Sequence, residues 1–415
     1  MKRLCRLKLF FPEVIKKLPR LRFLLCGSVI KKVNIMKRPY WMFALLILVL
    51  FSASIIRAED PFEKLNKDYE AQIKAMQRQY EGQRLDMEKQ WAELEKEQDE
   101  TWARLKAEVE RKWQAFVHST KKDWVDYNPD KDSRSKVDFK SGKIVFEAVV
   151  SKDDPEALAK ARRKIEQQVE KILRQTDVAN KRILENQLVT GQGDKVNFGN
   201  MKNYIKKEVL PRLIPAPQTY KAKDGVERRK YSVNIDLVPN HIRLRSEKYL
   251  PAVQKNAERF GLKPQLILAV MHTESYFNPK AVSGSRAIGI MQIIPKYAGR
   301  EAYRSIYGQD KLISWDYLFV PENNIELGSK YLSLLKYNHF RDIHGATKNH
   351  YVAIGGYNWG PTAMRRKIVD RYPLAQMSND QVYALLRQKT PQETRDYIKH
   401  VTERMSIYDP YFRSE

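Results

Sequence analysis

The sequence is poor in cysteine and histidine and has few long apolar runs. Its 415 residues include only 2 Cys and 7 His. Two thiols exclude a disulfide-rich scaffold and a four-cysteine zinc site. Charged residues make up 30% of the chain, which excludes a polytopic membrane protein. No group of His and carboxylates has the spacing of metal ligands, so neither a metal nor a cofactor is predicted.

Basic residues, in contrast, are in clear excess. The chain has 76 Lys and Arg against 50 Asp and Glu, which gives a formal net charge of +26. Such an excess favours an anionic partner, whether nucleic acid, a lipid surface or an acidic polymer. Nearly half of it falls within residues 1–58, and the other basic residues are dispersed without a nucleic-acid-binding motif. We therefore predict no nucleic-acid partner.

One apolar run stands near the start, where Trp41–Phe51 holds no charge and follows the basic Met36–Arg38. A basic start, a short apolar core and a small residue at Ala58 match a secretory signal peptide over residues 36–58. The run is also near the lower length limit for a bilayer span, so an uncleaved N-terminal anchor is the alternative. Residues 1–35 fit neither pattern and are interpreted as an upstream extension. Both alternatives place the chain in the periplasm or cell envelope, and the second attaches it to a membrane.

Residues 59–122 predict one long helix, because they contain almost no Gly or Pro. Apolar residues recur there at alternating steps of four and three: Tyr69, Ile73, Met76, Tyr80, Met87, Trp91 and Leu94. Such a seam among charged residues is typical of a coiled coil or helical hairpin. We expect either a spacer or a stalk that joins copies of the chain into an oligomer through residues 61–122. Alternatively, the Trp residues of this stretch pack against another domain.

The rest of the chain divides into two patterns. Residues 123–239 predict a small α+β domain, with a β-hairpin around Ser141-Gly142, a helix over 155–175, an irregular Pro-rich segment and a returning strand at 231–237. Residues 240–415 predict short apolar helices joined by polar loops. The expected fold class is therefore mainly α, with a small α+β domain and a long helix before a helical C-terminal domain.

A carboxylate ends one of these predicted helices. Pro264 suits the first turn, and Leu266, Val270 and Glu274 share one face of the helix. Burial and the helix macrodipole both raise the pKa of a Glu at a helix C-terminus, as a general acid requires. Taken alone, Glu274 is better explained by a side chain that turns out to solvent, because carboxylates at helix ends are common.

Three later segments carry amides, aromatic rings and glycines. The first, residues 283–295, contains Gly289, Met291 and Gln292 in a Gly-rich turn followed by an apolar strand or short helix. The second holds Tyr357 and Asn358 between glycines, and the third is Glu393–Tyr397 on a probable helix. Aromatic faces and amides are typical of a groove that binds sugars.

Together and in this order, the four motifs resemble the lytic murein transglycosylases of the soluble lytic transglycosylase and goose-type lysozyme-like superfamily. The motifs are Glu274-Ser275, Gly289–Gln292, Gly356–Asn358 and Glu393–Tyr397. The long helix and α+β domain are similar to those of the membrane-bound lytic transglycosylase C subgroup. Gly356 replaces the usual Ala, and no convincing lipidation cysteine is present.

The resemblance implies a lysozyme-like fold over residues 240–415 and cleavage of the MurNAc–GlcNAc bond of peptidoglycan glycan strands. Glu274 would act as both acid and base, which yields 1,6-anhydro-MurNAc ends without water. The substrate-binding residues it implies are Ser275, Gly289, Met291, Gln292, Tyr357, Asn358 and Tyr397. Two alternatives are a goose-type-lysozyme-like hydrolase and a non-catalytic cell-wall-binding protein that works through its coiled coil.

Overall fold

The structure, a computed structural model, describes residues 61–177 and 180–412. The chain divides at Tyr80 into two units, Met1–Tyr80 and Glu81–Glu415. The predicted extension and leader, residues 1–58, lie outside the described residues. No helix within the described part of the chain is both long enough and apolar enough to cross a membrane.

The first element is the 50-residue helix α2 (Pro61–Glu110). Its sequence is rich in Glu, Lys, Gln and Ala, and Arg84 pairs with Glu81 and Glu88 at helical spacing. The helix ends at Glu110 and does not continue to residue 122 as predicted. There the Trp113 indole donates to the Lys131 carbonyl oxygen at 2.7 Å. The chain therefore leaves the helix to pack onto the next domain.

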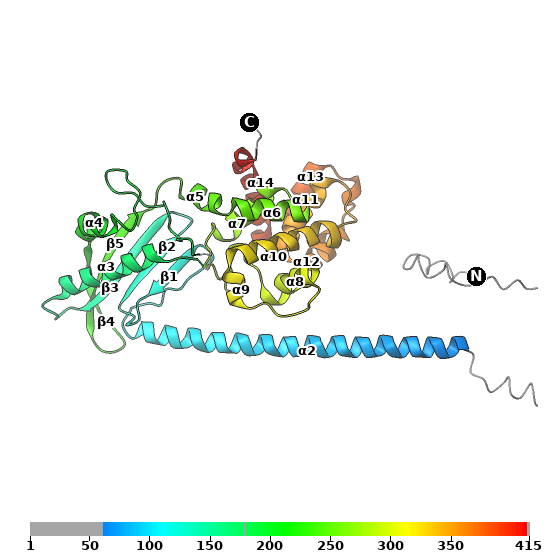
Figure 1. The fold of residues 1–415 in the computed structure, drawn as a ribbon, viewed down its shortest axis with the longest axis horizontal. Helices are drawn as coiled ribbons and strands as arrows, with labels where there is room; N and C mark the ends of the chain where they lie inside the picture. The colour runs from blue at the N-terminus through cyan, green and yellow to red at the C-terminus, as the bar shows by residue number, and fades with distance from the viewer. Residues whose placement is uncertain (1–60, 178–179, 413–415) are drawn as a thin grey trace, which may run out of the picture. The chain divides into compact units, whose positions relative to one another are not determined.

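The α+β domain is built on one antiparallel sheet with the strand order β1-β2-β3-β5-β4 (Figure 1). Its strands are β1 (Asp123–Tyr127), β2 (Ser133–Asp138), β3 (Lys143–Ser151), β4 (Ile214–Lys221) and β5 (Glu227–Asp236). The predicted hairpin at Ser141-Gly142 is confirmed, with Gly142 at φ 69° in the turn. Helix α3 (Ala157–Arg174) packs its apolar face on β2 and β3, and the short α4 (Met201–Tyr204) follows.

The Pro-rich segment, predicted to be irregular, is instead the edge strand β4. It contains Pro215 and Pro217 and, within the part of the chain that the structure describes, pairs with β5 alone, with a register shift between Pro215 and Thr219. An edge strand tolerates proline, because one side of its backbone needs no ladder hydrogen bond. The prediction failed because proline content alone does not distinguish an edge strand from a loop.

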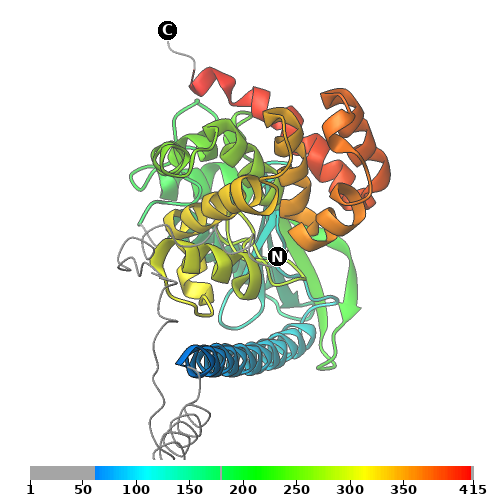
Figure 2. The same ribbon diagram turned by 90° about the vertical axis from the view of Figure 1, so that its right-hand side faces the viewer.

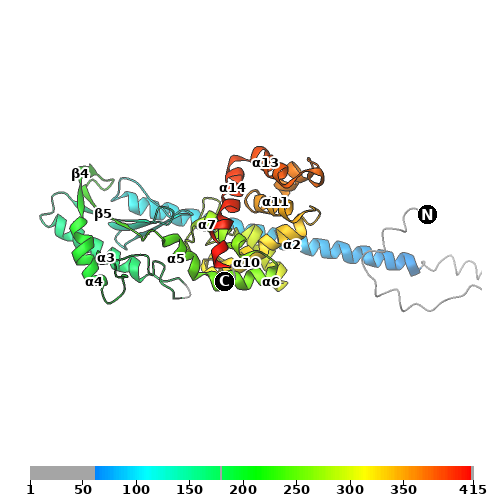
Figure 3. The same cartoon turned by 90° about the horizontal axis from the view of Figure 1, so that it is seen from above.

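The C-terminal domain is helical, as predicted. Its helices are α5 (His241–Lys248), α6 (Leu250–Phe260), α7 (Pro264–Ser275), α8 (Arg300–Tyr307), α9 (Trp315–Phe319), α10 (Pro321–Leu334), α11 (Ala346–Trp359), α12 (Pro361–Met364), α13 (Asn379–Lys389) and α14 (Gln392–Ile407). Seen from the side of these helices, the sheet lies behind them (Figure 2). Helix α14 packs along α7 and α11, which brings the last predicted motif to the end of α7 (Figure 3).

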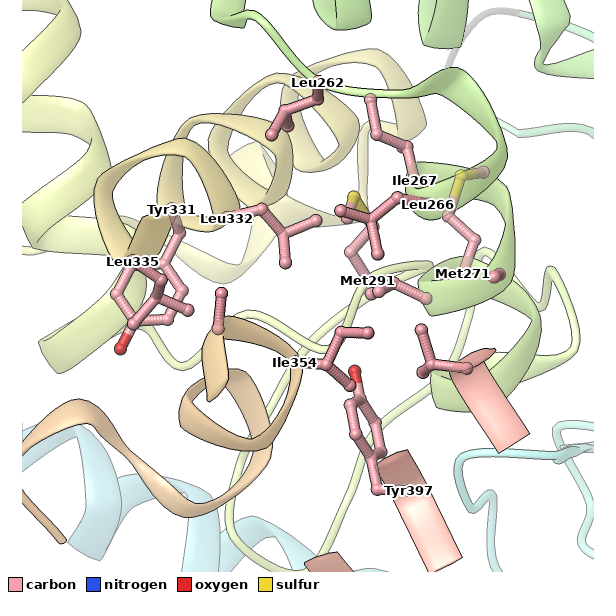
Figure 4. Close-up of a cluster of buried hydrophobic side chains, with 14 of the residues drawn as sticks. Leu262, Leu266, Ile267, Met271, Met291, Tyr331, Leu332, Leu335, Ile354 and Tyr397 are labelled. Atoms are coloured by element: carbon pink, nitrogen blue, oxygen red, sulfur yellow. The ribbon is translucent and has the colours of Figure 1, made fainter. Parts of the chain in front are cut away.

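The core of this domain surrounds α7. Leu266, Ile267 and Met271 are almost completely buried, and Met291 and Ile354 meet them from other segments (Figure 4). Burying an aliphatic side chain of this size contributes about 1.5–3 kcal/mol to folding. Helix α7 is therefore a rigid support for the residues at its C-terminal end.

A buried arginine joins the sheet domain to the helical domain. The Arg245 guanidinium on α5 donates to Gln187 Oε1 at 2.6 Å and to the Phe139 carbonyl oxygen at 2.7 Å. It also donates to the carbonyl oxygen of Tyr276, directly after α7, at 3.1 Å. Such hydrogen bonds from a charged group fix the α7 terminus relative to the sheet.

Candidate active site

Glu274 lies at the C-terminal end of α7 and is only 6% exposed. The alternative of a side chain turned out to solvent is therefore excluded. Burial raises the pKa of its carboxyl, whereas the Lys121 ammonium and the Tyr397 hydroxyl oppose that shift. A buried carboxyl with a raised pKa can hold a proton near neutral pH, which is the state that a general acid needs.

The charge nearest to Glu274 comes from outside the helical domain. Lys121 Nζ lies 3.5 Å from Glu274 Oε2. Lys121 belongs to the segment between α2 and β1, and its carbonyl oxygen accepts a hydrogen bond from Asn278 Nδ2 at 3.3 Å. The lysine is half-exposed, so solvent weakens the attraction between the two charges. No motif in the sequence pointed to this residue.

The backbone directly after Glu274 is strained. Tyr276 and Phe277 both adopt positive φ angles, 53° and 61°, in the left-handed region. Aromatic residues rarely adopt this conformation, which costs about 1–3 kcal/mol at each position. Such strain is concentrated at functional sites, and here it turns the chain sharply at the carboxyl group.

Ser275 links α7 to the second motif. It is fully buried, and its hydroxyl lies within hydrogen-bonding distance of the carbonyl oxygens of Met271 (3.2 Å) and Ile290 (2.7 Å). The segment around Ile290 forms no regular strand or helix, contrary to the prediction, but a loop with isolated bridges such as Ile288↔Ile293. Its apolar residues are buried because the loop folds into the core, a position that periodicity does not reveal.

Asn324 of α10 holds this loop in place. Its side chain accepts from the Met291 N–H at 2.8 Å and donates to the carbonyl oxygens of Ile288 and Leu318. Gly289 packs so closely against it, at φ 75°, that a Cβ atom would overlap the Asn324 side chain. Sequence analysis missed Asn324, since a lone amide inside a helix gives no signal without its partners.

The third and fourth motifs meet beside Glu274, together with the loop of the second motif. We call the part of the site formed by these motif residues the inner side of Glu274. Tyr357 donates to the Met291 carbonyl oxygen at 2.8 Å, and its ring stacks on that of Tyr397 at 6.4 Å and 8°. Asn358 accepts from the hydroxyl of Thr394 at 2.7 Å. Burial, together with the Glu274 carboxylate, raises the pKa of both tyrosines well above its usual value, so both stay protonated. The structure thus brings three separate segments to one carboxyl group.

Two polar atoms in this inner region have no hydrogen-bond partner among the described residues. They are the Tyr397 hydroxyl, which lies close enough to Glu274 to influence its pKa, and Gln292 Oε1. Gln292 is 6% exposed, adopts φ 51° and donates through its other amide atom to the Gly289 carbonyl oxygen. Buried polar atoms are almost always paired in folded proteins, so these two are available to a bound molecule.

The outer side of Glu274 opens into a cavity of about 1130 Å³. One wall comes from α2 and residues 111–123, and the other from the helical domain. The lining residues include Asp99, Trp102, Glu110, Phe116, His118, Lys121, Asp123, Glu274, Arg286 and Trp315. Of the predicted site residues, Glu274 alone appears in this lining, and the others stand behind it or at its inner side.

Comparison with known proteins agrees with this geometry. Residues 251–377 match the family described as transglycosylase SLT domain, and residues 87–248 match the N-terminal domain of membrane-bound lytic murein transglycosylase C. The protein of that name from Serratia proteamaculans is 33% identical over 311 residues, which cover 69% of this chain and 82% of the relative. The chain belongs to this family.

The comparison also finds a second relative and a solved structure. The namesake from Pectobacterium atrosepticum is 32% identical over 69% of this chain and 82% of its own length. A solved structure of an inactive variant of the lytic transglycosylase Slt from Pseudomonas aeruginosa is 30% identical over 39% of this chain and 24% of that chain, with a TM-score of 0.33. The predicted membership of the transglycosylase C subgroup is confirmed, as is the prediction of a lytic transglycosylase.

Proposed function

We propose that this chain cleaves the MurNAc–GlcNAc bond of peptidoglycan with Glu274 as the one acid and base. The observation that carries the proposal is that Glu274 is buried at the end of α7, lines the cavity and has a raised pKa. Protonated, it donates to the glycosidic oxygen, so that the bond from this oxygen to C1 of MurNAc breaks and GlcNAc leaves with a free hydroxyl. As carboxylate, it then accepts the proton of the C6 hydroxyl, whose oxygen bonds to C1 and closes the 1,6-anhydro ring. No water is consumed.

The other carboxylates of the cavity support a single catalytic group. Asp99 is paired with Arg286 at 2.7 Å, Glu110 with Lys223 at 2.5 Å, and Asp123 with Lys136 at 3.3 Å. A second catalytic carboxylate would be needed by most hydrolases that retain or invert the sugar. Each of these groups is instead paired with a cation from another part of the chain.

The inner residues divide into two roles. Ser275, Gly289 and Met291 are buried and held by protein contacts, so they position the loop and the catalytic helix. Gln292 and Tyr397 carry the unpaired polar atoms and contact the sugar or the Glu274 carboxyl. Tyr357 and Asn358 hold these groups through the Met291 carbonyl oxygen and Thr394.

The test is the rate of murein lysis by two carboxylate variants. Glu274→Gln removes the group that transfers protons, and acid–base catalysis of this kind contributes roughly 10²- to 10⁴-fold. Asp123→Asn, in the same cavity, retains the parent rate. Lysis that survives Glu274→Gln, or that is lost equally in Asp123→Asn, would contradict the proposal that Glu274 is the single catalytic carboxyl group.

We further propose that the protein works in the periplasm as a membrane-attached oligomer. The early part of α2 supports the oligomer, because Leu65, Tyr69, Met76 and Tyr80 are each at least half exposed. An apolar seam at heptad spacing is matched by the same seam of a second copy. Analytical ultracentrifugation of the full chain should show an oligomer, and Met76→Glu should dissociate it. A parent chain that sediments as a monomer would refute the oligomer.

A further inference from the structure

The cavity beside Glu274 carries aromatic rings that belong to none of the transglycosylase motifs. Trp102 of α2 and Phe116 and His118 of the following segment all line it. Trp102 lies edge-on to Phe116 at 5.8 Å and 71°, and Phe116 stacks on His118 at 5.8 Å and 20°. Trp102 and Phe116 are only partly buried. We call these three residues the aromatic shelf.

The shelf is held firmly in place. Arg286 Nη1 donates to Glu95 Oε1 at 2.6 Å and Nη2 donates to Asp99 Oδ1 at 2.7 Å, which fastens α2 to the loop of the second motif. On the other side Phe116 stacks on Tyr127 of β1 at 6.4 Å and 12°. Charge-assisted hydrogen bonds and ring contacts thus fix the rings before any ligand binds, which lowers the entropic cost of binding.

The opposite wall offers a polar partner. Trp315 of α9 lines the same cavity, and its indole Nε1 is buried without a hydrogen-bond acceptor among the described residues. A buried donor of this kind costs free energy unless an acceptor reaches it. Hydroxyl and acetamido oxygens of an aminosugar are acceptors of the required kind.

We propose that the aromatic shelf, with Trp315 opposite, is a subsite that binds an N-acetylhexosamine ring of the glycan strand away from the bond that is cleaved. The C–H face of the ring packs on Trp102 and Phe116, and its polar edge meets the indole N–H. The assignment rests on the proposed function, because shelf and catalytic carboxyl share one cavity. It places substrate recognition on α2 and residues 111–123, outside the transglycosylase domain.

The test measures binding rather than lysis. Peptide-free glycan strands are titrated against the full chain carrying Glu274→Gln, alone and combined with Trp102→Leu, Trp102→Phe or Tyr80→Leu. Trp102→Leu keeps an apolar side chain but removes the ring, and it should raise Kd roughly tenfold. Trp102→Phe should restore most of the affinity. Tyr80, an exposed aromatic of the same helix outside the cavity, is the matched control and should leave Kd unchanged.

The outcomes separate the two claims. Equal Kd values for Trp102→Leu and the parent, or an equal loss in Tyr80→Leu, would overturn the subsite. If Trp102→Leu does not fold, Phe116→Leu is measured in its place with the same expectation. Shortening of the strands by the Glu274→Gln protein would refute the proposed function, while the comparison of Kd values would still decide the role of the shelf.

Discussion

The two sides of Glu274 are built differently. The inner side consists of residues from the transglycosylase motifs, joined by short hydrogen bonds and largely buried. The outer side is an open cavity whose far wall comes from α2 and the segment before β1. The inner side therefore determines the chemistry of the carboxyl group. The outer side supplies the charged neighbour of Glu274, Lys121, and determines which molecules can reach the carboxyl group.

The largest effect is expected on the inner side, at Gly289. A Cβ atom there would lie 2.6 Å from the Leu318 carbonyl oxygen, at a φ of 75° that alanine disfavours. Gly289→Ala should lower the free energy of unfolding by about 3 kcal/mol and abolish most activity. Gly284→Ala, in the same loop with open space around it, is the control for urea unfolding. Equal free energies of unfolding for Gly289→Ala and Gly284→Ala would show that the loop accommodates the added Cβ atom without losing stability.

A smaller effect is expected at Tyr397, where a substitution should lower kcat without lowering thermal stability. Tyr397→Phe removes a buried hydroxyl that has no partner among the described residues but lies near Glu274. During the reaction this hydroxyl can donate to the Glu274 carboxylate once the carboxyl has given up its proton. A hydrogen bond to a charged group is worth about 1.5–3 kcal/mol, so kcat should fall roughly 10- to 100-fold. Thermal stability should not fall, since no protein hydrogen bond is lost. Tyr383→Phe, on α13, should change neither quantity, and an unaltered kcat in Tyr397→Phe would exclude the hydroxyl from the reaction.

The smallest effect concerns the outer side and appears in the pH profile. The Lys121 ammonium favours the carboxylate form and lowers the pKa of Glu274. Removing this charge in Lys121→Gln should raise that pKa further, so the protonated acid persists to higher pH. The descending limb of kcat/KM should move to higher pH by less than one unit, because the pair is partly solvated. Lys122→Gln, at the neighbouring residue, is the control and should leave the pH profile unchanged. A descending limb that moves to lower pH in Lys121→Gln, or that moves equally in both variants, would contradict the pairing of Lys121 with Glu274.

The inner residues were named by the resemblance to four family motifs, which singled out Glu274, Ser275, Gln292 and Tyr397. The structure brings these residues close together, and their roles in the reaction stay a prediction. The hairpin at Gly142 and the strand at 231–237 could be predicted from the residues themselves, since turn residues and alternation are local signals.

The outer side could not be predicted in this way. Lys121, Arg286 and Trp102 reach the cavity from widely separated positions along the chain, and no spacing rule connects them. The seam of α2 shows the same limit. Trp91 is buried, whereas Tyr69 and Met76 are exposed, although one periodicity covers residues 69–94. Periodicity identifies the apolar face of a helix but does not reveal which surface packs against that face.

The single-carboxyl reaction is tested most directly by digesting murein in water enriched in oxygen-18 and weighing the products by mass spectrometry. Ring closure by the C6 oxygen predicts MurNAc ends in the 1,6-anhydro form that contain no oxygen-18. Reducing MurNAc ends that carry the heavy oxygen would show that water attacks C1. That result would contradict the proposed reaction and make the protein a hydrolase.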